Sequence, residues 1–301
     1  MGTSTSLDEL RKILNIEQLP ALPHSALSVL QLDNDVAKVN INDLVRPIES
    51  DPGLAAQVLK FLNSSYFGFQ STISNIKQGI ALVGIRIVKN FVLWKAVFSL
   101  IPKSKLGDFD IALLWQDSLR RAMFTRFMLL ELKKGDPEIA FAGALLQDMS
   151  IPLLLKRSPD VYGGVLAKGL LNPKARLSSL ERSTFGWDHA QAGGLMGQNW
   201  KLPAPLITLI ENHLDIEEAI ANFDDHCEQS AVALSAFLPI AARAQWNEKD
   251  ECLSFINVVL PGRDEKLEAL FAKVDREYDQ YASILQLAKP KVALIDHLKE
   301  V

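Results

Sequence analysis

The chain has 301 residues, of which 48% are hydrophobic and 23% are charged, and its 32 basic and 36 acidic residues leave a net charge of −4. This composition is typical of a globular protein and excludes a disordered or collagen-like chain. The slight acidic excess makes nucleic acid an unlikely partner, because phosphate backbones are normally bound by basic surfaces. Cys227 and Cys252 are too few for a disulfide framework or a thiolate zinc site, which favours a reducing, intracellular setting.

An export signal or a membrane-spanning segment is not apparent in the sequence. Within residues 1–6, the residues that follow the initiator Met1 are polar or small and uncharged, unlike the basic start of a signal peptide. The apolar runs at 91–102 and 231–242 are shorter than the roughly 20 residues that cross a bilayer. We therefore expect a cytoplasmic protein without membrane insertion.

Apolar residues in the first hundred positions recur at the 3.6-residue period of α-helices, and strand signals are almost absent. One helix is expected to begin at Pro52, because Ser50 or Asp51 can cap its free amides and proline suits the first helical position. An aromatic turn, 66–69, follows that helix. The helices expected in this region lie near 26–30, 41–48, 52–62, 76–83 and 85–100.

The helical pattern continues beyond a polar stretch at 103–105, which we expect to separate two lobes of one helical body. The tail from about 228 to 301 is also expected to be helical, with Pro239, Pro261 and Pro290 as breaks. No repeat of fixed period occurs, which argues against a solenoid. The further helices expected in the second half lie near 110–133, 137–148, 151–157, 159–170, 188–199 and 203–213.

A series of short motifs runs from residue 15 to residue 215. In order they are Leu19-Pro20-Ala21-Leu22-Pro23, Ile48-Glu49-Ser50-Asp51-Pro52-Gly53-Leu54, Leu62-Asn63-Ser64 with Tyr66-Phe67-Gly68, Ile80-Ala81-Leu82-Val83-Gly84, Leu114-Trp115, Ala142-Gly143 through Asp148, Asp188-His189-Ala190 and Trp200-Lys201-Leu202-Pro203.

In this order the motifs resemble the HDOD domain, a helical relative of the HD-type metal phosphohydrolases that occurs mainly in bacterial signalling proteins. The resemblance implies an all-α, HD-domain/PDEase-like fold. It divides the HDOD domain at 15–215 into an N-terminal lobe at about 15–103 and an HD-like lobe at about 108–215. Residues 216–301 would then form a helical C-terminal extension.

The resemblance also implies that the metal site of the HD hydrolases is degenerate here. Those enzymes hold one or two divalent ions with a His, a His-Asp pair and a further Asp, and the ion acidifies water and neutralises phosphate charge. In this chain the first His position is Asp117, and the pair reads Gln147-Asp148. The last Asp has no acidic counterpart within 231–240. We therefore expect no bound metal, no other cofactor and no catalytic residues.

Asp117, Asp148, His189 and His213 remain from the metal-binding pattern and could converge in the core. One interpretation is that they are remnants, hydrogen-bonded into the fold. The other is that Arg120 or Arg121, three and four residues after Asp117, supplies the positive charge that a metal once gave and pairs with Asp148 or Asp117. Either arginine would relieve the cost of burying a lone carboxylate.

The sequence gives weaker support for a functional role at other candidate residues. We expect His24 to be a surface residue, and 225–227 (Asp-His-Cys) not to share an ion, because adjacent residues on a helix point in different directions. Cys227 is not expected to be a nucleophile, since no base is placed beside it. Tyr66, Phe67 and Phe69 are expected to belong mostly to the core, but the same residues could leave an exposed aromatic surface for a partner.

The resemblance implies a non-catalytic signal-transduction or regulatory module, not an enzyme, whose partners are signalling proteins in trans or a small ligand such as a nucleotide second messenger. Two alternatives stay open. The chain could be a residual metal-dependent phosphohydrolase acting on a nucleotide or cyclic dinucleotide, or a sensor that binds a nucleotide without hydrolysing it.

Overall fold

The computed structural model describes residues 2–32, 38–100, 109–172, 174–241, 243–260, 264–285 and 287–299. Throughout these ranges the regular structure consists of helices, and no β-strand is formed. The expected all-α fold class is therefore confirmed. The expected boundary between two lobes, at 103–108, lies outside the described residues.

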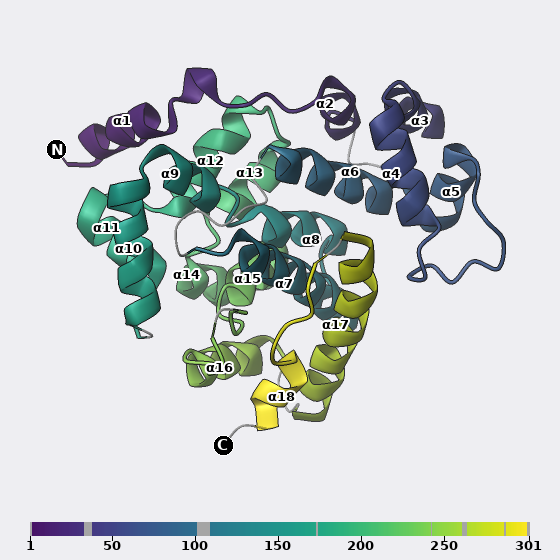
Figure 1. Ribbon diagram of the computed structural model, residues 1–301. Coiled ribbons are helices and arrows are strands. Elements are labelled where there is room, and N and C mark those ends of the chain that lie inside the picture. The colour runs from purple at the N-terminus through teal and green to yellow at the C-terminus, as the bar shows by residue number, and fades with distance from the viewer. Residues whose placement is uncertain are drawn as a thin grey trace.

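Residues 24–99 form a group of helices at one end of the molecule, whereas residues 2–18 lie at the other, where the first helix packs against α9 (Ile151–Arg157) and α12 (His189–Asn199) (Figure 1). Asp51 caps α4 by accepting a hydrogen bond from the Leu54 amide, and Pro52 is the first helical residue, as expected from the sequence. The described helices of residues 2–99 are α1 (Gly2–Leu14), η1 (Ile16–Gln18), α2 (His24–Leu30), α3 (Ile41–Glu49), α4 (Pro52–Leu62), α5 (Ile76–Val83) and α6 (Ile85–Ser99).

The long helix α7 (Ile111–Leu132) runs through the centre of the molecule (Figure 1). Its side chains are buried over almost the whole length because α8, α15 and α17 pack around it. Polar residues on α7 therefore face protein, and each needs a partner there. The helices that follow α7 are α8 (Pro137–Leu146), α9 (Ile151–Arg157), α10 (Pro159–Leu171), α11 (Leu177–Phe185), α12 (His189–Asn199), α13 (Ala204–Glu211) and α14 (Ile216–Ala221).

The C-terminal helices fold back onto the centre. Helix α15 packs against both α7 and α8, and α17 lies along α7. Phe271 of α17 is fully buried and contacts Phe124 of α7, edge to face, with ring centroids 6.0 Å apart. The tail thus completes the same hydrophobic core. Its helices are α15 (Cys227–Ser235), α16 (Lys249–Val259), α17 (Asp264–Leu285) and α18 (Leu294–Lys299).

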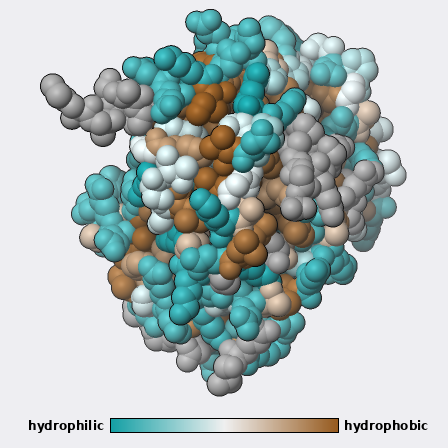
Figure 2. Space-filling model, turned by 60° about the vertical axis from the view of Figure 1, so that its left-hand side comes forward, coloured by the Kyte–Doolittle hydropathy of each residue, from teal (hydrophilic) through white to brown (hydrophobic). Residues whose placement is uncertain are grey.

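One stretch of the described chain is long and apolar enough to cross a bilayer. This stretch, Pro137–Arg157, spans 21 residues, and 89% of its most apolar window is buried inside the fold. It is longer than the apolar runs noted in the sequence, and it comprises the core helices α8 and α9. On the face drawn in Figure 2, hydrophobic side chains are exposed as separate patches among hydrophilic ones.

Candidate functional site

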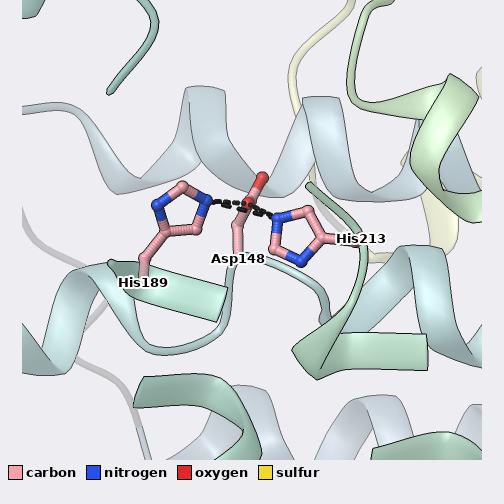
Figure 3. A group of neighbouring side chains, drawn as sticks. All are labelled: Asp148, His189 and His213. Carbon is pink, nitrogen blue, oxygen red and sulfur yellow. Dashed lines mark hydrogen bonds and ion pairs between the residues drawn. The ribbon is translucent and has the colours of Figure 1, made fainter. Parts of the chain in front are cut away.

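Three residues from distant parts of the chain meet in the core at the ends of helices (Figure 3). Asp148 lies in the turn between α8 and α9, His189 is the first residue of α12, and His213 lies just beyond α13. Asp188 fixes the start of α12, because its carboxylate accepts the amides of Ala190 and Gln191. All three side chains of the Asp148–His189–His213 cluster are buried.

The facing atoms of the cluster are close enough to interact directly. Asp148 Oδ1 lies 3.4 Å from His189 Nε2 and 3.6 Å from His213 Nε2, and the two Nε2 atoms are 3.2 Å apart. His213 Nδ1 lies 2.7 Å from the Ile210 carbonyl oxygen, so Nδ1 carries the proton and Nε2 of a neutral ring is an acceptor. A proton or a cation must therefore lie between these facing atoms.

His189 supplies such a proton. Its Nδ1 lies 2.6 Å from Glu181 Oε2 on α11, and the Tyr162 hydroxyl donates to the other oxygen of Glu181. Burial alone would lower the pKa of His189, but Glu181 and Asp148 outweigh burial and raise it from 6.5 to about 10. At neutral pH His189 is thus an imidazolium, and its Nε2–H faces both Asp148 and His213.

A second positive charge reaches Asp148 from α7. Arg121 Nη1 bonds to Asp148 Oδ2, and both side chains are buried. Burial would raise the pKa of Asp148, but Arg121 and the hydrogen bond from His189 hold it well below the usual value. The arginine–carboxylate pair of the second interpretation is therefore present, and it uses Arg121. Arg120 interacts electrostatically with Asp117 and Asp275 instead.

Gln147 and Asp117 bond to groups outside the cluster. Gln147 Oε1 accepts a hydrogen bond from the Ser235 hydroxyl at 3.2 Å, and Asp117 Oδ1 accepts the Ala241 amide at 2.7 Å. Burial raises the pKa of Asp117 to about 6, although Arg121 and Arg120 oppose the rise. Five positions were compared with the HD pattern. Asp148, His189 and His213 converge, whereas Gln147 and Asp117 bond elsewhere.

The cluster could hold one metal ion. Its three ligand atoms lie within 4.8 Å of one another, and both histidines bond through Nδ1 to oxygen acceptors, as metal ligands commonly do. The larger ligand set of the HD hydrolases is not assembled, because Gln147 and Asp117 bond elsewhere. Arg121, bonded to the same carboxylate, also repels a further cation. The residues present therefore fit at most a single ion.

The cluster lines part of a cavity of about 770 Å³. The walls come from the start of α7, from the α10–α11 connection, and from the segment between α15 and α16. Arg121 and Asp117 line the cavity together with the three cluster residues. A site of this kind, with convergent buried polar groups in a large hollow, is the form that small-molecule sites usually take.

Glu181 is the residue of this site that sequence reasoning did not identify. The helix that carries it, α11, was not expected either; it is short, and most of its nine residues are polar. The one available signal was its position eight residues before His189, which places it on the helix preceding the α12 cap. Its pairing with His189 depends on how α11 packs against α10.

The other candidate residues lie apart from the cavity lining. Tyr66 and Phe67 are partly buried, and Tyr66 packs edge to face on Tyr281 of α17 with centroids 4.4 Å apart. Phe69 stacks on Phe67 and is 36% exposed. His24 is exposed on the first turn of α2, as expected.

The Asp225-His226-Cys227 stretch shows no shared geometry for an ion. Asp225 and His226 are exposed, whereas Cys227 is buried. Burial raises the pKa of the Cys227 thiol to about 11, which disfavours the reactive thiolate.

A sequence profile of the HDOD domain matches residues 19–216, about two thirds of the chain. The chain belongs to the HDOD domain family. A curated relative from Treponema pallidum is 23% identical over 210 residues, which are 68% of this chain and 39% of the relative. Bacillus subtilis YuxH is 30% identical over 112 residues, which are 36% of this chain and 27% of YuxH. The names of both relatives assign no function, and the chain spans well under half of either.

Solved structures share this HDOD fold over nearly its whole length. An HDOD domain protein with unknown function from Geobacter sulfurreducens has a TM-score of 0.70 at 20% identity, covering 95% of this chain and 99% of that one. A protein from Shewanella amazonensis named "Putative phosphohydrolase" gives the same TM-score, identity and coverage. At this identity the likeness establishes the fold alone.

Proposed function

We propose that this HDOD protein is a non-catalytic bacterial signalling module that acts by binding a protein or a small ligand. The observation that carries the proposal is the bond between Arg121 and Asp148. The carboxylate that would bind a metal in an HD hydrolase has a permanent internal cation. A protein of similar fold from Marinobacter aquaeolei, named "Putative signal transduction protein", gives modest support, with a TM-score of 0.65 and 17% identity over 95% of this chain and 64% of that one.

The electrostatic cost explains why this pair argues against hydrolysis. A unit charge about 4 Å from a second one changes the energy by about 4 kcal/mol at the effective dielectric constant near a protein surface. A divalent ion beside Arg121 would meet twice that repulsion. Arg121 and the His189 imidazolium already bring two positive charges to Asp148, the same charge as a divalent ion.

Metal content and turnover test the proposal together. Protein purified after growth with manganese, iron, nickel and zinc should contain far less than one ion per chain by elemental analysis. It should also leave a broad panel of phosphomonoesters, nucleotides and cyclic dinucleotides intact when these metals are added. A stoichiometric ion accompanied by turnover would contradict the proposal.

A metal-dependent phosphohydrolase is the second candidate, favoured by the spacing of Asp148, His189 and His213. An ion held there would acidify a bound water and neutralise phosphate charge. This candidate requires that Asp148→Asn abolish a measurable turnover without unfolding the protein. The same variant has no activity to lose if the module is non-catalytic.

We place this module in the cytoplasm, with signalling proteins as its partners in trans. The proposed partner surface is the aromatic group Tyr66, Phe67 and Phe69, of which Phe69 is the most exposed. A pull-down from the native cell with wild-type protein should recover a partner that Phe69→Ser loses and that Leu130→Ser retains. Leu130 is a suitable control because it is exposed on another helix, α7. If both variants recovered the partner equally, the aromatic group would not be part of the interface.

A further inference from the structure

We infer that the cavity above the Asp148–His189–His213 cluster binds an organic phosphate of nucleotide size, with its phosphate at Arg121 and its planar body against the apolar wall. This inference rests on the proposed function, because it names a ligand for a site that does not turn it over. The names of the HDOD profile and of the similar structures mention no ligand.

The cavity is large enough for an organic molecule. The cavity holds about 770 Å³, in the upper part of the range for small-molecule sites, roughly 300–1,000 Å³. A metal ion with its waters, or inorganic phosphate alone, would leave most of this volume unfilled. The cavity therefore suits a ligand with a substantial organic body.

The cavity offers donors for an anion beside the cluster. Arg121 lines the cavity and is bonded to Asp148 through Nη1, and a guanidinium carries further N–H donors on its other nitrogens. Forked donors of this kind match the oxygens of phosphate. Arg176 and the exposed Lys174 also line the cavity and add positive charge to it.

Most carboxylates of the lining already have partners within the protein. Asp110 accepts the Ala112 amide, and Asp117 accepts the Ala241 amide. Asp148 pairs with Arg121, and Glu248 lies 3.3 Å from Arg176. Arg121 and Arg176 are the partners in these two ion pairs, but each guanidinium has more N–H donors than its pair uses, and the remaining donors suit an anion.

The wall beyond Arg121 is apolar and partly aromatic. Trp246 lines it and is held in place by a 2.7 Å hydrogen bond from its indole nitrogen to the Phe237 carbonyl oxygen. Leu113, Leu177 and Leu238 line the same cavity. A fixed aromatic ring beside leucine side chains provides a surface on which a planar base can pack.

Calorimetric titration of the full chain tests the inference with four probes: AMP, GMP, inorganic phosphate and guanosine. At least one nucleoside monophosphate should bind at millimolar concentration or below. Phosphate and guanosine should each bind at least about tenfold more weakly, because phosphate lacks the planar organic body and guanosine lacks the phosphate. No heat from either nucleotide would overturn the inference, as would equal binding of guanosine and GMP.

Variants locate the binding. Arg121→Lys keeps the positive charge beside Asp148 but loses the forked donors, and should weaken nucleotide binding about tenfold. Lys174→Ala changes an exposed side chain that should not affect folding, and should weaken binding about threefold. Lys168→Ala is the matched control, an exposed lysine on α10 outside the lining, and should bind like wild type.

Wild-type affinity in both Arg121→Lys and Lys174→Ala would overturn the site assignment. If Arg121→Lys proves unfolded by circular dichroism, Lys174→Ala alone decides the question. Chromatography of the recovered nucleotide separates the two proposals. Intact nucleotide supports both, whereas cleavage after binding supports the ligand class and contradicts the non-catalytic function.

Discussion

Arg121 on α7 bonds to Asp148 in the turn after α8, and the two side chains are only 9% and 7% exposed. The two residues are 27 positions apart in the chain, and the bond joins the central helix to the histidine cluster. An internal ion pair of this kind costs a great deal to break, about 3–5 kcal/mol when one partner is removed, because a buried charge is left alone. In the folded state Asp148 is thus paired with the positive charge of Arg121.

Arg121→Gln should convert the cluster into a metal site. Glutamine is close in size and remains polar, but it removes the positive charge that repels an ion at Asp148. We expect elemental analysis after zinc loading to find about one ion per chain in this variant and far less in wild type. The double variant Arg121→Gln/Asp148→Asn should lose the ion again, and equal metal content in wild type and Arg121→Gln would refute this role for the arginine.

Glu181→Gln should lower the pKa of His189. Glu181 raises that pKa by attraction and hydrogen bonding, and glutamine retains only a neutral acceptor. In the wild type, NMR of the His189 ring should show the imidazolium form up to about pH 9. In the variant the ring should titrate at a clearly lower pH. Matching titration curves would show that Glu181 does not hold the charge.

The same pair predicts a pH dependence of stability. A folded-state pKa of about 10 exceeds the ordinary value of 6.5. Stability from this group is therefore fully present below the unfolded pKa and is lost as the pH rises toward the folded one. The free energy of unfolding, measured in urea from pH 6 to pH 10, should fall more in wild type than in Glu181→Gln.

Asp117→Asn should be more stable than wild type at neutral pH. Burial raises the pKa of Asp117 from 3.8 to about 6, so the folded state holds its proton more tightly than the unfolded state. Wild-type stability therefore falls as the pH rises between these values, by about 3 kcal/mol for a difference of this size. Asparagine keeps the acceptor for the Ala241 amide and does not titrate. Urea unfolding of both proteins at pH 4 and pH 7 measures the difference, and identical pH profiles would show that Asp117 does not carry this penalty.

Phe271→Ala should destabilise the whole protein, not just its tail. Phe271 is fully buried and contacts Phe124 of α7 and Trp246. Removal of a buried phenylalanine typically costs about 3–5 kcal/mol. We expect this loss in a single unfolding transition followed by circular dichroism. Val258→Ala, at a position 61% exposed on α16, should change stability little, and a separate early transition in Phe271→Ala would show that the tail folds independently.

Helix positions were largely predictable because their signals are local. The start of α4 follows from the Asp51 cap and Pro52, and the start of α12 from the turn at Gly186 and the residues after it. Helices α1 and α11 were not among the expected ones, and α14 falls in the stretch that was expected only as a helical extension. The missed α11 carries Glu181, so the partner of His189 was missed with it.

The sequence by itself determined the all-α class and most helix starts, because these depend on residue identity and near neighbours. Only the tertiary structure decided between Arg120 and Arg121 as the partner of Asp148. Adjacent residues on a helix point about 100° apart, and the packing of α7 against α8 selects which of them faces the cluster. The cavity likewise exists only where α7, α10, α11 and the segment after α15 come together, since its walls belong to residues more than a hundred positions apart.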